Sequence, residues 1–68
     1  MQLNDIIRFK SGPFKGLRGK VVKIEEYSNS DGTGMPMRVM LNFEFAKFKV
    51  QMTRSEYNTW ETEIVQNG

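Results

Sequence analysis

Apolar and polar residues alternate in four stretches of the chain, and this period of two is typical of half-buried β-strands. In the first stretch Ile7 and Phe9 share one parity and Arg8 has the other, so one face is apolar and the other basic. The pattern predicts short strands within residues 5–10, 19–26, 37–45 and 46–52.

The stretch at 19–26 is less regular because two valines are adjacent in it. Val22 and Ile24 stand two residues apart, as the inward-facing positions of a strand do. Val21 is then expected on the opposite face or at a β-bulge.

Between the third and fourth stretches the apolar parity changes once. The apolar positions are Val39, Leu41, Phe43 and Phe45, followed by Phe48, Val50 and Met52. A tight hairpin at Phe45-Ala46 explains the change, because a shift of one residue moves every side chain to the other face.

The C-terminal stretch begins with Thr53 three residues ahead of Glu56, which is the spacing of a capping box. It predicts a helical turn over residues 54–58, followed by a final strand. We expect Tyr57 and Trp60 to pack against the open end of the domain rather than to serve as stacking platforms.

Two stretches rich in glycine and small polar residues separate the strands. Residues 11–19 contain three glycines, of which at least one is expected to hold a positive φ that other residues tolerate poorly. Their spacing matches neither a phosphate-binding P-loop nor a dinucleotide fingerprint. The run at 27–36, with its Asp31-Gly32 turn signal, is expected to be the most mobile loop.

Four or five short strands, one helical turn and no long helix predict an all-β fold, a small antiparallel barrel. No internal repeat or linker divides the sequence. Residues 1–68 are therefore expected to form a single domain.

Composition argues against several classes of site. The chain has no histidine and no cysteine, which removes the commonest general base, the thiolate nucleophile and the usual zinc ligands. We expect no enzymatic activity, no metal and no cofactor. No apolar run approaches the ~20 residues that span a bilayer, and no signal-peptide pattern is visible, so a cytoplasmic monomer without membrane contact is expected.

The net charge of +2 is unevenly distributed along the chain. Residues 6–24 contain six basic residues and no acidic one, whereas residues 25–68 contain seven acids and four bases. The basic segment is either ordinary solvated surface or a site for an acidic partner, with RNA or DNA the commonest kind. Phe14 could stack on an unpaired base, and the candidate phosphate contacts are Arg8, Lys10, Lys15, Arg18 and Lys20.

The stretch "DIIRFKSGPFKGLRGKVVKIEE" resembles the KOW motif, in which a strand with alternating apolar residues meets a glycine loop and then a second strand. The matching positions are Ile7, Phe9, Gly12, Pro13, Phe14, Gly16, Gly19, Val21 and Ile24. With the predicted hairpin at 38–52, the chain is similar to the C-terminal KOW domain of NusG-type transcription elongation factors over most of residues 4–57. The resemblance implies an SH3-like five-stranded antiparallel barrel that binds partners without catalysis.

The same resemblance implies the partners and the contact residues. The partner would be RNA, a ribosomal protein or a component of a transcription complex, in the regulation of transcription or translation. Partner contacts would come from Phe14, Leu17, Phe43 and Phe45, with a place in the core as the alternative for the three phenylalanines. The alternative for the whole protein is an SH3-like protein-binding adaptor without affinity for nucleic acid, of a kind that a mobile element could encode.

Overall fold

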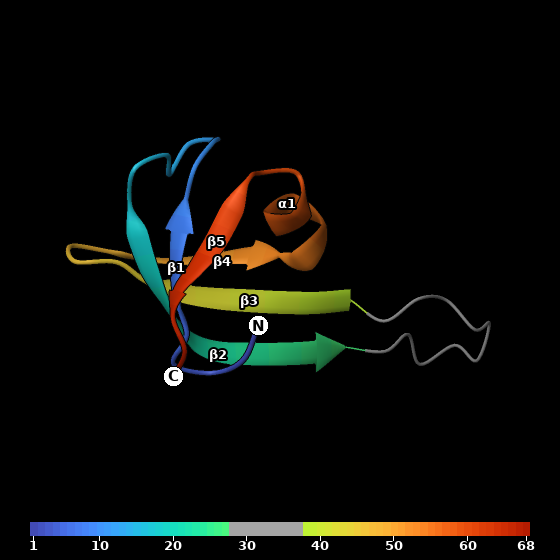
Figure 1. The fold of residues 1–68 in the computed structure, drawn as a ribbon. Coiled ribbons are helices and arrows are strands. Elements are labelled where there is room, and N and C mark those ends of the chain that lie inside the picture. The colour runs from blue at the N-terminus through green and yellow to red at the C-terminus, as the bar shows by residue number, and fades with distance from the viewer. Residues whose placement is uncertain (28–37) are drawn as a thin grey trace.

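The computed structural model describes residues 1–27 and 38–68, and contains five strands and one short helix in these ranges (Figure 1). Apart from Tyr27, the loop predicted at 27–36 lies outside the described residues. The elements are β1 (Ile6–Phe9), β2 (Arg18–Tyr27), β3 (Arg38–Glu44), β4 (Lys49–Thr53), α1 (Arg54–Asn58) and β5 (Thr62–Gln66).

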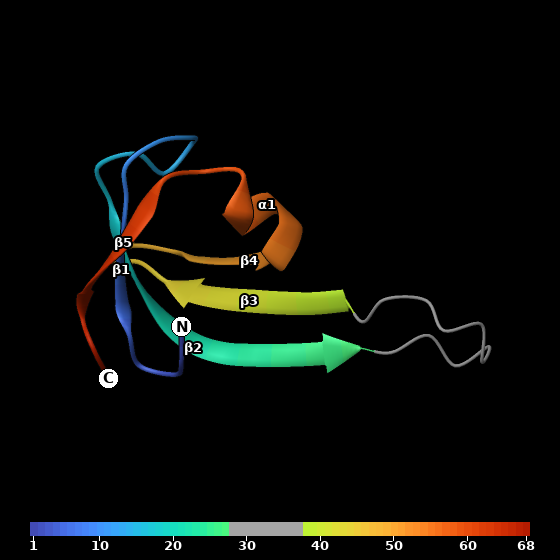
Figure 2. The ribbon, with the colours of Figure 1, turned by 45° about the vertical axis from the view of Figure 1, so that its right-hand side comes forward.

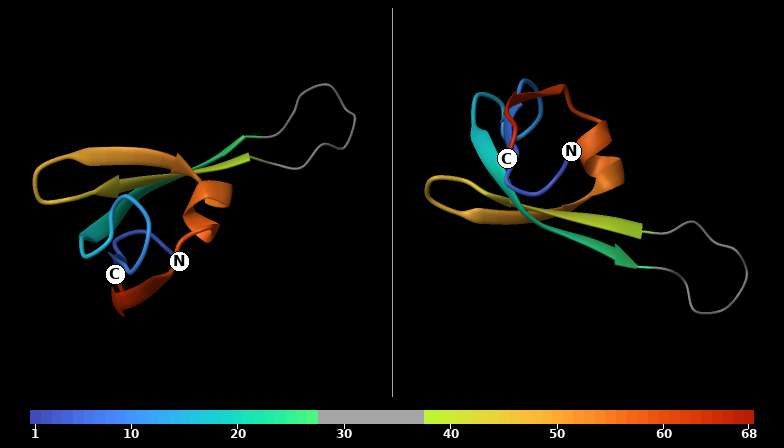
Figure 3. Two further views of the ribbon diagram at one scale, coloured as in Figure 1. Left: turned by 90° about the horizontal axis from the view of Figure 1, so that it is seen from above. Right: turned by 60° about the horizontal axis from the view of Figure 1, so that its bottom comes forward.

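All five strands belong to one antiparallel sheet with the order β4-β3-β2-β1-β5. The long strand β2 is shared, because residues 18–20 pair with β1 and residues 20–27 pair with β3. The sheet curls around the core, and α1 lies between the two edge strands β4 and β5 (Figures 2 and 3). The all-β, five-stranded antiparallel fold with one helical turn is confirmed, and the curl of the sheet is consistent with the predicted SH3-like barrel.

A β-bulge at Val22 lies where β2 passes from one half of the sheet to the other. The register with β3 shifts between Val21 and Lys23, which leaves Val22 as the extra residue. Val21 is fully buried, Val22 is 39% exposed and Ile24 packs against the core. The prediction that Val22 and Ile24 share the inner face is therefore wrong for Val22, because the bulge brings Val21 and Ile24 to the same side instead.

The core is centred on the ring of Phe9. Strand parity correctly predicted most of its buried members, which are Ile7, Phe9, Val21, Leu41, Phe43, Phe45 and Met52. The ring centroid of Phe9 lies 5.3 Å from that of Phe43 and 5.7 Å from that of Phe45. Tyr57 and Trp60 also meet the Phe9 ring edge to face, at 6.1 and 6.2 Å, so both are packing residues as predicted.

The helical turn predicted at 54–58 is confirmed, and it begins with the predicted capping box. The Glu56 amide donates to the Thr53 hydroxyl at 3.1 Å, and the Thr53 amide donates to the Glu56 carboxylate at 3.1 Å. These bonds satisfy backbone donors that the short helix α1 leaves without internal partners. The cap thereby turns the chain at the end of β4 and sets Tyr57 against the core.

The Asp5 carboxylate joins the two ends of the described chain. Asp5 is 1% exposed, and its two oxygens accept hydrogen bonds of 2.9 Å from the Gln2 and Gly68 amides. The Gly68 bond, and then the Gln2 bond, lower the pKa of Asp5 from its ordinary value of 3.8. The backbone carbonyl of Asp5 also accepts from the Val21 amide at 3.0 Å, so the joined ends are fixed to β2.

Two glycines of the loop at residues 11–19, Gly12 and Gly16, differ in what an added side chain would meet, although both have a positive φ. Gly12 and Gly16 have φ values of 82° and 86°, which confirms the expected positive φ. A Cβ atom at Gly12 would lie 2.6 Å from the Trp60 ring, whereas one at Gly16 would meet nothing within 4 Å. We expect Gly16→Ala to lower the free energy of unfolding by about 1 kcal/mol through strain alone, and Gly12→Ala to lower it further.

Urea denaturation of both variants measures this difference. Gly16→Asn is the control, because asparagine tolerates a positive φ better than alanine and should recover part of the loss. Equal losses in Gly12→Ala and Gly16→Ala would contradict the inferred contact with Trp60.

The Asp5 carboxylate predicts a pH dependence of stability. Because its pKa is lower in the folded protein, Asp5 contributes stability above the ordinary value of 3.8, and this contribution is lost as pH falls through the folded pKa. We expect Asp5→Asn to lower the unfolding midpoint at neutral pH and to approach the wild type in strong acid. Thermal denaturation of the wild type and Asp5→Asn, from neutral pH to strong acid, tests this prediction. Glu26→Gln, which changes an exposed carboxylate, is the control. A difference in unfolding midpoint between Asp5→Asn and the wild type that does not change with pH would contradict the prediction.

Candidate nucleic-acid interface

The loop between β1 and β2 is held in a compact shape by its own backbone hydrogen bonds. The Gly16 amide donates to the Phe9 carbonyl at 2.8 Å, and the Leu17 amide donates to the Phe14 carbonyl at 3.0 Å. The loop packs Phe14 partly against the core and leaves Leu17 41% exposed. An apolar side chain is thus presented to solvent from a fixed backbone.

Three phenylalanines from the loop and the β3–β4 turn form what we call the phenylalanine stack: Phe14, Phe45 and Phe48. The Phe45 ring lies 5.3 Å from Phe14 and 4.8 Å from Phe48 between centroids, with interplanar angles of 22° and 20°, and the Phe14 and Phe48 centroids are 6.3 Å apart, so each ring contacts the other two. Phe45 is 6% exposed and Phe48 is 43% exposed. The stack therefore runs from the core to the surface.

The stack depends on the absence of a side chain at Gly19. Gly19 is buried in β2, and a Cβ atom there would lie 3.0 Å from two atoms of the Phe45 ring. Contacts this short are tighter than ordinary van der Waals packing. Glycine at this position lets the turn approach the backbone of β2 closely.

The four predicted partner contacts separate into two groups. Leu17 is exposed and Phe14 is half-buried, so both can reach a surface. Phe43 is fully buried and Phe45 nearly so, which corrects their expected placement at a contact surface and supports the alternative of a core position. Both are inward-facing aromatic residues of β3 or its end, and the curled sheet covers them.

The sequence pattern assigned Phe48 to the inner face, and so missed it as a surface residue. Strand parity fails there because β4 begins one residue later, at Lys49, and Phe48 still belongs to the turn. The Phe45 amide donates to the Phe48 carbonyl at 2.8 Å and closes that turn. The flanking residues Lys47 and Lys49 could not have identified Phe48 as exposed, because Phe9 is also flanked by two basic residues and is fully buried.

Two of the predicted phosphate contacts are engaged with an acid. Arg8 and Lys10 both form salt bridges with Glu63 of β5, the Lys10 bond at 3.1 Å. The Lys10 hydrogen bond, and then the charges of Arg8, Lys10 and Arg18, lower the pKa of Glu63 from its ordinary value. Glu63 is thus anionic at neutral pH and partly cancels the positive charge of Arg8 and Lys10.

The other predicted phosphate contacts remain exposed. Lys15, Arg18 and Lys20 form no salt bridge within residues 1–27 and 38–68. Lys47 is also exposed, and Lys49 pairs with Glu44 only at 3.8 Å. Because Lys15, Arg18, Lys47 and Lys49 adjoin Phe14, Leu17 and Phe48 along the chain, basic and apolar groups occur together at this end of the protein.

Comparison with known proteins finds no matching family, curated protein or solved structure. Within the described ranges, no helix is long and apolar enough to cross a membrane. The same ranges contain no group of three or more acidic, histidine or cysteine side chains that could hold a metal ion.

Truncation of two rings in the stack should reduce stability by very different amounts. Phe45→Ala should lower the free energy of unfolding by about 3–5 kcal/mol, as for other buried phenylalanines. Phe48→Ala should lower it by only about 1 kcal/mol, because Phe48 is 43% exposed and loses only its contacts with the Phe45 and Phe14 rings. Thermal unfolding monitored by circular dichroism distinguishes them, and a Phe48 variant as unstable as the Phe45 variant would show that Phe48 belongs to the core.

Proposed function

We propose that this protein is a non-catalytic module that binds single-stranded RNA at the phenylalanine stack. The observation that carries the proposal is the ring of Phe48, which is 43% exposed, stacked on a buried ring and flanked by Lys47 and Lys49. In this proposal an unpaired base stacks on Phe48, while Lys15, Arg18 and Lys47 contact phosphates.

The geometry supports stacking because the ring is held in place before the ligand arrives. Phe48 is stacked on Phe45, which itself packs against Phe9 and Phe14. A ring with restricted rotamers loses little conformational entropy on binding. Stacking of a base on such a ring contributes about 1–3 kcal/mol and is tolerant of sequence.

The charge distribution supports a polyanionic ligand. Residues 10–20 and 43–50 contain six basic residues and one acid, Glu44. Each neutralised phosphate releases condensed counterions, so several exposed lysines and arginines supply affinity that does not depend on sequence.

The resemblance to the KOW motif suggests the cellular process in which the RNA is bound. It supports a role in the regulation of transcription or translation, in the cytoplasm, with the RNA carried by a ribosome or a transcription complex. A protein-binding adaptor is the second candidate, because Leu17 and Phe48 are both more than 40% exposed and could fill apolar pockets of a protein partner.

Binding of a labelled single-stranded RNA octamer, measured by fluorescence anisotropy between about 50 and 200 mM salt, tests the proposal. These three phosphate contacts should contribute about −2 to the log–log slope, at roughly −0.7 per contact for a single strand. Replacement of Lys15, Arg18 and Lys47 by glutamine should therefore make the slope shallower by about 2. Phe48→Ala should weaken binding about 5- to 150-fold with little change of slope.

Arg54→Gln is the matched control, because it removes an exposed charge from α1. It should change neither affinity nor slope. No binding at low ionic strength would reject the RNA proposal and favour the protein-binding adaptor.

A further inference from the structure

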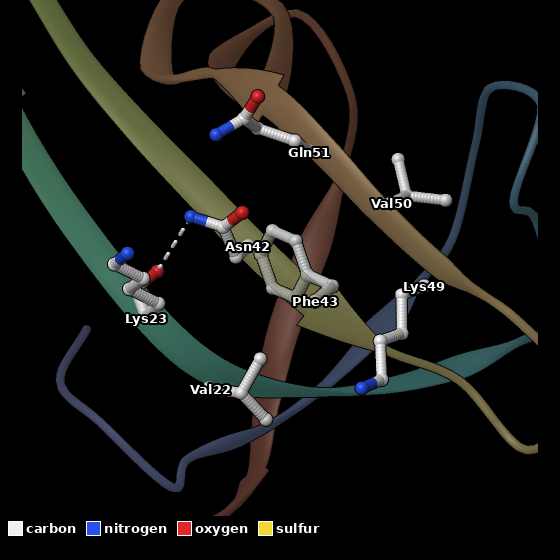
Figure 4. A pocket seen from close by; sticks show the side chains of 7 residues that line it. All are labelled: Val22, Lys23, Asn42, Phe43, Lys49, Val50 and Gln51. Carbon is white, nitrogen blue, oxygen red and sulfur yellow. Dashed lines mark hydrogen bonds between the residues drawn. The ribbon is translucent and has the colours of Figure 1, made fainter.

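A groove of about 410 Å³ lies on the outer face of β2, β3 and β4, apart from the phenylalanine stack (Figure 4). Its volume is within the range of roughly 300–1,000 Å³ that is common for small-ligand sites. Its lining includes two lysines, two carboxamides and an exposed valine: Lys23, Lys49, Asn42, Gln51 and Val22. This combination offers an apolar contact, hydrogen-bonding groups and positive charge in one place.

The two carboxamides are held in a defined orientation by Glu25. Asn42 and Gln51 are directly opposed across β3 and β4. Their amide nitrogens donate to the same Glu25 oxygen at 3.3 and 3.4 Å, and Asn42 also donates to the Lys23 carbonyl at 3.4 Å (Figure 4). These bonds are long. Both N–H groups of Asn42 are engaged, so Asn42 retains only its oxygen acceptor, whereas Gln51 retains an oxygen acceptor and a second N–H for a ligand.

Glu25 remains an acceptor at neutral pH because its charged form is stabilised. The Tyr27 hydroxyl hydrogen bond, then the charge of Lys23 and the Asn42 amide, lower the pKa of Glu25 from its ordinary value. Glu25 is therefore a positioning residue that keeps the nitrogen ends of both carboxamides turned toward it.

The two ammonium groups of the groove are loosely paired. The Lys23 ammonium lies 3.6 Å from Glu25, and the Lys49 ammonium lies 3.8 Å from Glu44. The lysine side chains are 66% and 77% exposed, and ion pairs of this kind contribute little to stability. Each ammonium group can therefore exchange its carboxylate partner for a phosphate at a small cost in free energy.

The β-bulge supplies the apolar contact. It turns Val22 out of the core and into the wall of the groove, where Figure 4 shows the Lys49 side chain extending toward it. Bulges often re-aim a side chain beside a functional site. The methyl groups of Val22 offer a surface against which the flat face of a base can pack.

We propose that this groove binds one unpaired adenine nucleotide of the RNA strand, an inference that rests on the proposed function. Glutamine recognises adenine through paired hydrogen bonds to N6 and N7, and Gln51 retains the oxygen and the N–H that this pair needs. The base face lies on Val22, and Lys23 and Lys49 contact the adjoining phosphates. Residues 48 and 51 of the chain are about 10 Å apart, at roughly 3.3 Å per strand residue, which a few nucleotides stacked at about 3.4 Å can span.

Affinities for single-stranded A, U and C octamers test this assignment in the wild type and in Asn42→Ala/Gln51→Ala. The wild type should bind the A octamer at least about 5-fold more tightly than the others, and the double variant should lose this preference. If the double variant fails to fold, the same measurement is made with Gln51→Met, which keeps the length of the side chain but lacks the amide. Asn58→Ala on α1 is the matched control and should keep the preference.

The outcomes separate this inference from the proposed function. If no octamer binds, or if Phe48→Ala has no effect, the proposed function fails and the groove assignment fails with it. If the octamers bind in a Phe48-dependent way but without preference for A, or with a preference that survives loss of the carboxamides, only the groove assignment is overturned.

Discussion

The ring of Phe9 is the contact on which the rest of the structure depends. It meets five other aromatic rings, which come from the glycine loop, β3 and its end, α1 and the segment before β5: Phe14, Phe43, Phe45, Tyr57 and Trp60. A domain of this size has only about 3–5 kcal/mol of stability, which is comparable to the contribution of one buried phenylalanine. Fold and surface are thus linked, because the exposed Phe48 ring is supported through Phe45 by the same central ring.

Much of the fold could be predicted from local sequence because its determinants are local. Alternation placed Ile7, Phe9, Leu41 and Phe43 on the inner face, and Thr53 with Glu56 located the helix. The position of Val22 could not be decided this way, because a bulge depends on the pairing of β2 with β3 rather than on either sequence alone.

The candidate site was harder to predict than the fold, because its properties depend on contacts between distant parts of the sequence. The basic segment correctly drew attention to Lys15, Arg18 and Lys20 as exposed charges. It could not show that Arg8 and Lys10 meet Glu63, which comes from the other end of the chain. Nor could parity show that Phe48 lies outside β4, since that depends on where the turn closes.

The sharing of β2 between both halves of the sheet affects how the molecule can open. Val21 pairs with Phe43 of β3 and exchanges backbone hydrogen bonds with residues 4 and 5 on the other side. Because Val21 is fully buried in the one core that both halves share, neither half can separate without exposing that core to solvent. Partial opening is therefore disfavoured, and the amides of the central part of β2 should exchange with solvent only through unfolding of the whole domain.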